Sequence, residues 1–190
     1  TPVSALLHAV AVVKAGVFTM LKVGIYIFGI DFLAETGASV WLMWLAGFSI
    51  LMASLIAMAQ DNLKRRLAYS TVSQVSYIAL GVSLAHPVAA LGGVIHLVHQ
   101  GIMKITLFLC AGNYAETLGV HKVSQMDGVG RRMPGTTLAF TVGALGMIGI
   151  PPIAGFVSKW YLGLGAVEAE QYWVLLILAA STLLNAGYFL

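Results

Sequence analysis

Three lysines interrupt segments that are otherwise apolar, and a lysine in such a place is a candidate proton carrier. Lys14, Lys104 and Lys159 each lie within a long run of apolar residues. A charged lysine near the centre of a bilayer costs about 2.5–3.5 kcal/mol on insertion scales, so three such residues need a reason. Snorkelling to the headgroups is the structural alternative, and it suits lysines close to helix ends. Desolvation favours the neutral amine, so modest changes in nearby charge can load or unload a proton. We interpret these lysines as candidate sites of proton translocation.

The segment HLVHQGIMK, residues 96–104, places two histidines and a glutamine close to one of these lysines. His96, Gln100 and Lys104 recur every four positions and would form one stripe on a helix, with His99 on its flank. Histidine can carry protons near neutral pH, and glutamine can orient water. A metal site shared by His96 and His99 is the competing interpretation, and the lack of further ligands at a chelating spacing argues against it. We expect this stripe to carry protons.

A proline pair predicts a broken helix in GALGMIGIPPIAGFVSKWYL. Pro151 and Pro152 remove two backbone donors and clash with the preceding turn. Irregular backbone at membrane depth is tolerated only where it is buried in protein or lines a wet cavity. Broken helices are common at the ion sites of transporters, and Lys159 follows the pair by seven residues.

Two other polar groups have more than one interpretation. His8 begins the first apolar run and would either flank a path near Lys14 or lie at the membrane interface. A hydroxyl-rich segment begins the third run, for which we prefer hydrogen bonding between helices over proton wiring. Its members are Ser70, Thr71, Ser73, Gln74 and Ser76.

The composition predicts the kind of fold that positions these residues. Hydrophobic residues make up 59% of the chain and charged residues 9%, against about one quarter charged in a soluble domain. Runs of about 20 apolar residues are long enough to cross a bilayer as helices. They cover residues 3–29, 40–60, 67–85, 89–112, 136–163 and 171–190. The sequence therefore predicts an all-α, polytopic transmembrane bundle of about six helices, one broken at Pro151–Pro152, in a single domain spanning residues 1–190.

The charges of the connectors predict the orientation of this bundle. Six alternating spans place the connectors near 61–66 and 113–135 on one side, where Lys and Arg are concentrated, and the acid-bearing connectors on the other. The first set holds Lys64, Arg65, Arg66, Lys122, Arg131 and Arg132, and the second holds Asp31, Glu35, Glu168 and Glu170 but no Lys or Arg. The positive-inside rule then predicts that Lys64–Arg66 and Lys122–Arg132 are cytoplasmic in a cell inner (plasma) membrane. The net charge of +3 forms no continuous basic patch, so we expect no nucleic-acid partner.

Several other functions are disfavoured. No Gly-rich nucleotide loop, catalytic triad or flavin motif is visible, so we expect no enzymatic activity or cofactor in this chain. Cys110 is the single cysteine and cannot form an internal disulfide or a thiolate metal site. The chain starts at Thr1 without an initiator Met or signal peptide, and we expect it to be part of a longer protein.

Four segments together carry a family likeness. They are TPVSALLHAVAVVKAGVF, DNLKRRLAYSTVSQVSYIALG, HLVHQGIMKITLFLCAGNYAE and GIPPIAGFVSKW. In this order and spacing they closely resemble the proton-antiporter membrane domain shared by the large subunits of Mrp-type cation/proton antiporters and the antiporter-like subunits of respiratory complex I. The likeness covers nearly all 190 residues. The surroundings of Lys14 and the segment GNYAETLGVHKVSQMDGVGRRMP look most like the D subunit of the Mrp antiporter.

The resemblance implies a subunit that moves protons along buried lysines and histidines joined by water. Lys14, Lys104 and Lys159 match lysines of that path. His8 and His96 match its histidines. Several relatives carry a second histidine where this chain has Gln100, which leaves the roles of Gln100 and His99 open. The family also uses a membrane glutamate upstream of Thr1, so the resemblance implies that this chain is the C-terminal part of the domain.

Our leading hypothesis is a proton-translocating subunit of a multisubunit monovalent cation (sodium)/proton antiporter. The nearest alternative is an antiporter-like, proton-pumping subunit of NADH:quinone oxidoreductase (complex I). Hypotheses from other classes are a small-solute carrier that uses the helix break and a non-conducting structural subunit. The expected partners are other membrane subunits, protons, sodium as a candidate cation, and the lipid bilayer.

Overall fold

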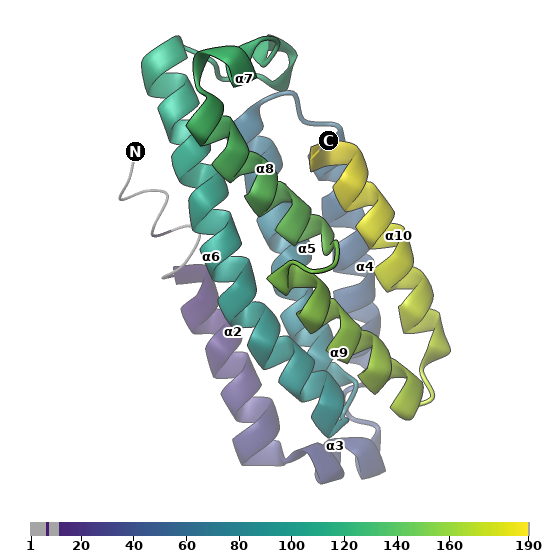
Figure 1. Ribbon diagram of the computed structural model, residues 1–190. Coiled ribbons are helices and arrows are strands. Elements are labelled where there is room, and N and C mark those ends of the chain that lie inside the picture. Colours follow the sequence, from purple (N-terminus) through teal and green to yellow (C-terminus); the bar gives the residue numbers. More distant parts are fainter. Residues whose placement is uncertain (1–6, 8–11, 190) are drawn as a thin grey trace.

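The computed structural model describes Leu7 and residues 12–189, so His8 lies outside the described residues. The regular elements of the described part are helices, and the longer ones run along a common direction (Figure 1). They are α2 (Val12–Lys22), η2 (Val23–Phe28), α3 (Ile30–Thr36), α4 (Val40–Met58), α5 (Leu63–Ser83), α6 (Pro87–Leu118), η3 (Val123–Gln125), α7 (Val129–Arg132), α8 (Pro134–Ile148), α9 (Ala154–Glu168) and α10 (Tyr172–Phe189). The predicted all-α bundle is confirmed, and each of the six predicted apolar runs contains at least one helix.

The first predicted run is less regular than its composition suggested. α2 continues into the π-helix η2, and the chain then bends by 79° into α3. Gly29 makes this bend with a φ of +82°, a conformation that costs glycine little because it has no Cβ. Residues 30–36, which we expected to be a connector, form the short helix α3 after the bend.

The next three helices pass back and forth through the bundle. Asn62 caps α5, since its side chain accepts a 3.1 Å hydrogen bond from the Arg65 amide. Pro87 occupies the first position of α6, where its missing N–H costs nothing. α6 is 32 residues long, because the helix continues beyond the predicted end at residue 112 to Leu118. This helix lies between α5 and α9 and can present side chains to both.

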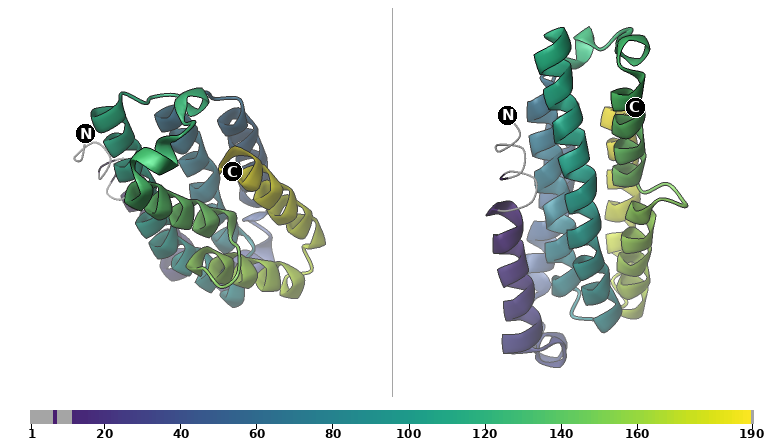
Figure 2. Two further views of the ribbon diagram at one scale, coloured as in Figure 1. Left: turned by 45° about the horizontal axis from the view of Figure 1, so that its top comes forward. Right: turned by 60° about the vertical axis from the view of Figure 1, so that its left-hand side comes forward.

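The fifth predicted run is interrupted as the proline pair indicated. α8 ends at Ile148 and α9 begins at Ala154, so the predicted break at Pro151–Pro152 is confirmed. Gly149 ends α8 with a φ of +88°. Figure 2 shows the connecting loop projecting at mid-height from the column that α8 and α9 form together.

Judged by the length and composition of its helices, the structure contains fewer candidate membrane spans than the apolar runs of the sequence predicted. Among the described residues, α4, α6 and α10 are each long and apolar enough to cross a membrane, and the bent pair Val12–Phe28 with Ile30–Thr36 would make a fourth span. α8 and α9 are each 15 residues long, so the break makes each one shorter than the roughly 20 residues that a full span requires.

The apolar core has separate parts around the polar centre of the bundle. One part joins α5, α6 and α8 through residues such as Leu67, Leu107 and Met147. Another joins α4, α9 and α10 through Ile50, Leu162 and Val174. These packed layers fix the faces of α5 and α6 that carry the polar side chains.

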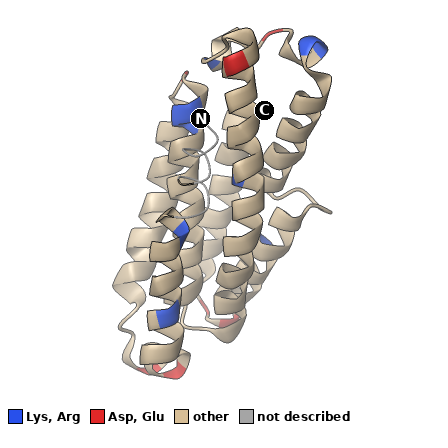
Figure 3. Cartoon of the chain, turned by 90° about the vertical axis from the view of Figure 1, so that its left-hand side faces the viewer, with Lys and Arg blue, Asp and Glu red and all other residues tan. Residues whose placement is uncertain are grey.

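The connectors meet in two groups, at opposite ends of the bundle. At one end, the Leu63 amide donates to the carbonyl of His121 at 3.0 Å, and the Val123 amide donates to the carbonyl of Asp61 at 2.8 Å. At the other end, His86 lies 3.1 Å from the Glu168 carboxylate. Figure 3 shows basic residues gathered at one end, besides the lysines within the bundle. The connectors are therefore grouped as we predicted, whichever side of the membrane each end faces.

Candidate functional site

Lys104 lies in the middle of α6 and is completely buried, with an exposed fraction of 0%. Its Nζ donates to the Ser70 Oγ at 2.5 Å and to the Leu67 carbonyl at 3.0 Å, both on α5. The ring of Phe189 in α10 lies 5.6 Å from the same Nζ. The side chain therefore does not snorkel out of the bundle, because its partners hold it inside.

His96 lies two turns before Lys104 on the same face of α6 and is also buried. Its Nδ1 is 2.8 Å from the Ser158 Oγ of α9, and its Nε2 is 3.1 Å from the Gln74 Oε1 of α5. The ring of Tyr77 packs against it with centroids 5.3 Å apart. The imidazole thus connects α9, which carries Lys159, with α5, which supplies the hydrogen-bond acceptors of Lys104.

Lys14 reaches the same helix from α2. Its Nζ donates to the Leu97 carbonyl at 2.7 Å. The amine contacts Gly101, where a Cβ would collide with it. A cavity of about 320 Å³ adjoins this contact, lined by Lys14, Val98 and Ile105 among others. The lysine therefore docks on α6 between the levels of His96 and Lys104.

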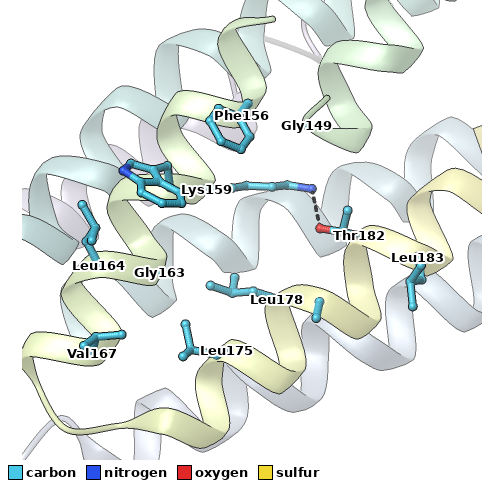
Figure 4. A pocket seen from close by; sticks show the side chains of 12 residues that line it. Gly149, Phe156, Lys159, Gly163, Leu164, Val167, Leu175, Leu178, Thr182 and Leu183 are labelled. Atoms are coloured by element: carbon cyan, nitrogen blue, oxygen red, sulfur yellow. Dashed lines mark hydrogen bonds between the residues drawn. The ribbon is translucent and has the colours of Figure 1, made fainter. Parts of the chain in front are cut away.

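Lys159 binds the broken end of α8. Its Nζ donates to the Ile148 carbonyl at 2.8 Å, to the Met147 carbonyl at 3.2 Å and to the Thr182 Oγ1 of α10 at 3.3 Å. Carbonyls in the last turn of a helix have no partner within the helix, and the helix dipole there favours a cation. Figure 4 shows the Lys159 side chain pointing toward Thr182 at one end of a groove of about 690 Å³, which is lined mainly by apolar side chains of α9 and α10. The break thus creates the site that holds this lysine.

Gln100 and His99 differ in their surroundings. Gln100 is completely buried, and neither its Oε1 nor its Nε2 has a hydrogen-bond partner. His99 is half-buried, and its Nδ1 has no partner either. Gln100 therefore shares the buried face of His96 and Lys104, as the four-residue spacing predicted. A proton-carrying role for either residue stays a prediction.

The hydroxyl-rich part of α5 makes two kinds of contact between helices. Ser73 does join helices, since its Oγ lies 2.8 Å from the Ser54 Oγ of α4. Ser70 and Gln74, in contrast, contact Lys104 and His96 directly. Our preference for hydrogen bonding between helices therefore holds for Ser73 and is incomplete for Ser70 and Gln74. It is not met by Thr71 and Ser76, whose hydroxyls donate to carbonyls of α5 itself.

Sequence reasoning missed the contribution of α10. Asn185 and Tyr188 are buried, and the Tyr188 hydroxyl donates to the Asn185 Oδ1. The Tyr188 side chain also interacts with Ser70, Gln74 and Ser54. The signal was the polar series Ser181, Asn185 and Tyr188 at helical spacing in an otherwise apolar run. These residues lie on the buried side of α10.

The three lysines share one kind of environment. The partners of their amines in the structure are neutral oxygens of carbonyls and hydroxyls. Neutral acceptors suit a proton carrier, because they hold an ammonium group without the strong attraction of a carboxylate. Buried lysines and a buried histidine, gathered around one interior helix beside a broken one, are features typical of polytopic membrane domains that move ions.

The comparison with known proteins specifies this class. The family model described as "NADH:quinone oxidoreductase/Mrp antiporter, TM" matches residues 1–185. The chain belongs to this family.

Individual relatives include members of both branches. The chain is 44% identical over 146 residues to "NADH-quinone oxidoreductase subunit N" of Desulforudis audaxviator, which covers 77% of this chain and 29% of that protein. It is 36% identical over 171 residues to a probable K(+)/H(+) antiporter A/B subunit of Rhizobium meliloti, covering 90% of this chain and 16% of that protein. A chain of the Mrp complex from Dietzia sp. superimposes with a TM-score of 0.85 at 25% identity, covering 98% of this chain and 34% of that chain. The chain thus spans less than a third of the length of these two curated relatives.

Proposed function

We propose that this chain forms part of a proton-translocating membrane subunit of a multisubunit monovalent cation/proton antiporter. The observation that carries the proposal is Lys104, a lysine with no exposed surface in the middle of a membrane-spanning helix. Burial of an amine at this depth is costly, and a purely structural role would be served as well by an apolar side chain. Its hydroxyl and carbonyl partners stabilise the amine whether or not it carries the extra proton.

The route that we propose uses α6 as its centre. Lys14 docks on α6 from α2, while His96 connects α6 to Ser158 of α9, the residue next to Lys159. Lys104 lies farther along the same buried face. Protons would pass among these amines and the imidazole, with His8 and His99 as further candidates on the path.

The alternative is an antiporter-like subunit of a NADH:quinone oxidoreductase. The likeness to a subunit N favours it, and the proton path would be the same in both proteins. They differ in the process to which proton movement is coupled, which is cation exchange in the first and quinone reduction in the second. Co-purification with NADH-oxidising subunits would identify the second.

We also propose the orientation and the partners. The protein lies in the cell inner membrane, and its basic connectors Lys64–Arg66 and Lys122–Arg132 face the cytoplasm. The neighbouring subunits are other membrane proteins of the assembly, as is implied by the multisubunit complexes among the relatives.

The test is to replace Lys104 by Ala in the full-length assembly. Inverted membrane vesicles report exchange as the collapse of a pH gradient when sodium or potassium is added. We expect Lys104→Ala to abolish exchange while the matched variant Lys22→Ala, which removes an exposed lysine, preserves it. Normal exchange by a fully assembled Lys104→Ala complex would contradict the proposal and favour the non-conducting scaffold.

A further inference from the structure

The aromatic ring of Tyr77 in α5 contacts both the lysine of the broken helix and the histidine of α6. The Lys159 Nζ lies over this ring, 5.3 Å from its centroid. The imidazole of His96 packs beside it, with ring centroids 5.3 Å apart and planes inclined by 42°. The Tyr77 side chain is completely buried. One ring inside the bundle therefore contacts two groups of the proposed proton path.

The hydroxyl group of Tyr77 fixes the orientation of the ring. It donates to the Ser181 Oγ of α10 at 2.6 Å. The next residue of α10, Thr182, accepts a hydrogen bond from the Lys159 amine at 3.3 Å. Two consecutive residues of α10 thus hold the ring and the amine, so one short segment of this helix sets their distance.

The face of the ring distinguishes the two charge states of Lys159. The Met147 and Ile148 carbonyls and the Thr182 hydroxyl can accept from a neutral amine as well as from an ammonium group. An aromatic face, in contrast, attracts a cation through its quadrupole, and this attraction requires the positive charge. It acts within about 6 Å of the centroid, a range that includes the observed contact. The ring therefore favours the protonated form of Lys159.

The titratable side chains that face Lys159 supply no negative charge near neutral pH. α5 presents Tyr77, and α6 presents His96, whose charge and that of Lys159 disfavour each other. α8 has no titratable side chain, and α10 has tyrosines only at its ends. On α9 itself the acid is Glu168, which lies at the end of the bundle. Among the described residues, the ring face is thus the neighbour of Lys159 that responds to its charge favourably.

A similar arrangement is found at Lys104. Its Nζ lies 5.6 Å from the centroid of the Phe189 ring, and its hydrogen-bond acceptors are also neutral oxygens. The ring belongs to α10 in this case, whereas the ring beside Lys159 belongs to α5. Two interior lysines on different helices therefore each have an aromatic ring from another helix beside the amine.

We propose that Tyr77 is a positioning residue for proton transfer, whose aromatic face stabilises the protonated form of Lys159. The inference rests on the proposed proton path through Lys159. A proton that reaches the lone pair of Nζ forms an N–H bond, and the ring face and the oxygen acceptors then hold the ammonium group together. When the proton leaves for the next carrier, the neutral amine keeps oxygen partners but loses the attraction to the ring. The ring thus affects how readily Lys159 takes up a proton.

Replacements at position 77 separate the ring face from the hydroxyl group. Tyr77→Phe keeps the face and removes the bond to Ser181, whereas Tyr77→Leu removes the face as well. A graded series places monofluoro-, difluoro- and trifluorophenylalanine at this position by nonsense suppression. Each fluorine withdraws electron density from the face, while the ring keeps nearly the same size. Tyr114→Leu is the matched control, because it also removes a buried ring of α6, one that packs against Phe140.

The readout is the rate of cation/proton exchange as a function of pH, in inverted vesicles that contain the full assembly. Because Lys159 must regain its proton in each cycle, the alkaline limb of this profile reports how strongly its ammonium form is stabilised. We expect Tyr77→Phe to keep the wild-type limb. Tyr77→Leu should move the limb downward by about one pH unit, since a less stabilised ammonium group releases its proton at a lower pH.

The fluorinated series should move the alkaline limb downward step by step, in the order of the number of fluorines. Tyr114→Leu should keep the wild-type limb, even though the loss of a buried ring lowers the thermal midpoint of the assembly. Native gel electrophoresis reports whether each variant assembles. If Tyr77→Leu does not assemble, the fluorinated series decides, because its members retain the shape of the ring.

Two results would overturn the proposal. One is a trifluorophenylalanine protein whose alkaline limb equals that of Tyr77→Phe. The other is a Tyr77→Phe protein with the same shift as Tyr77→Leu, which would assign the effect to the hydroxyl group. If Lys104→Ala abolishes exchange but the fluorinated series leaves the limb unchanged, only the role of Tyr77 is excluded. If Lys104→Ala has no effect, the proton path itself fails, and this inference fails with it.

Discussion

The side-chain amine of Lys14 in α2 donates a 2.7 Å hydrogen bond to the Leu97 carbonyl in α6, 83 residues along the chain. This contact exists because α6 has no side chain at Gly101, and the space of the missing Cβ is occupied by the Lys14 amine. The absence of a side chain at Gly101 therefore lets the Lys14 amine reach the backbone of α6. The pair links α2 to the helix along which we propose that protons move.

Replacing Gly101 by Ala should displace the Lys14 amine without removing it. The new Cβ would collide with the flexible end of the lysine, so we expect slower cation/proton exchange in vesicles with normal assembly. Gly16→Ala is the control. Gly16 lies in the same helix as Lys14, and a Cβ added there meets nothing within 4 Å. Equal exchange rates for both variants would show that the docking of Lys14 on α6 does not matter for transport.

Lys159 should stabilise the broken helix as well as carry protons. Lys159→Met leaves the Met147 and Ile148 carbonyls without this donor, and each unsatisfied buried group costs about 1–3 kcal/mol. We expect a lower thermal midpoint of the purified assembly together with a loss of exchange. Thr182→Val removes only the hydroxyl partner of the same amine and should shift the midpoint less. A Lys159→Met midpoint equal to that of the wild type would contradict the structural half of this prediction.

The sequence predicted the features that depend on local chemistry. Apolar runs predicted the helices, the proline pair predicted the break between Ile148 and Ala154, and the four-residue spacing predicted the buried face of His96, Gln100 and Lys104. Each of these follows from residues that are close together in the chain. The likeness to the D subunit of the Mrp antiporter and the single-domain boundaries stay predictions.

The remaining features depend on contacts between distant segments. Nothing near Lys14 indicates that it binds the Leu97 carbonyl, and nothing near Ser70 indicates that it accepts from Lys104. The short helix α3 was missed because Asp31 and Glu35 made residues 30–39 look like a connector. Periodicity identifies a buried face, but the partners of that face are decided by tertiary packing.

Arg66 should fasten α10 to the loop before α5. Its Nε donates to the Gln60 carbonyl at 2.9 Å, and its Nη1 donates to the Tyr188 carbonyl at 3.0 Å. A lysine ammonium lacks the planar fork that reaches both acceptors, so Arg66→Lys should destabilise the bundle by about 1–3 kcal/mol. Thermal unfolding of the assembly measures this, with Arg65→Lys at the neighbouring exposed position as the control. Equal midpoints for the two variants would exclude this role for Arg66.

Asp61 should make the basic end of the bundle sensitive to acid. The Ser124 backbone amide donates to its carboxylate at 3.1 Å, and this bond, followed by the Ser124 hydroxyl and the charges of Lys122 and Arg66, lowers the pKa of Asp61 below its ordinary value of 3.8. Because the folded-state pKa is the lower one, the stabilisation is complete above pH 3.8 and is lost as the pH falls through the folded value.

The Asp61→Asn variant should therefore unfold at a lower temperature than the wild type near neutral pH, and the difference should disappear in acid. Thermal unfolding followed from neutral pH into acid, to a pH below the folded-state pKa of Asp61, measures this convergence. Ser124→Ala removes the hydroxyl bond but keeps the backbone amide, which is the larger cause of the lowered pKa, so it should preserve most of the pH dependence. If Ser124→Ala removed the pH dependence as completely as Asp61→Asn, the hydroxyl and not the backbone amide would be the main partner of the carboxylate.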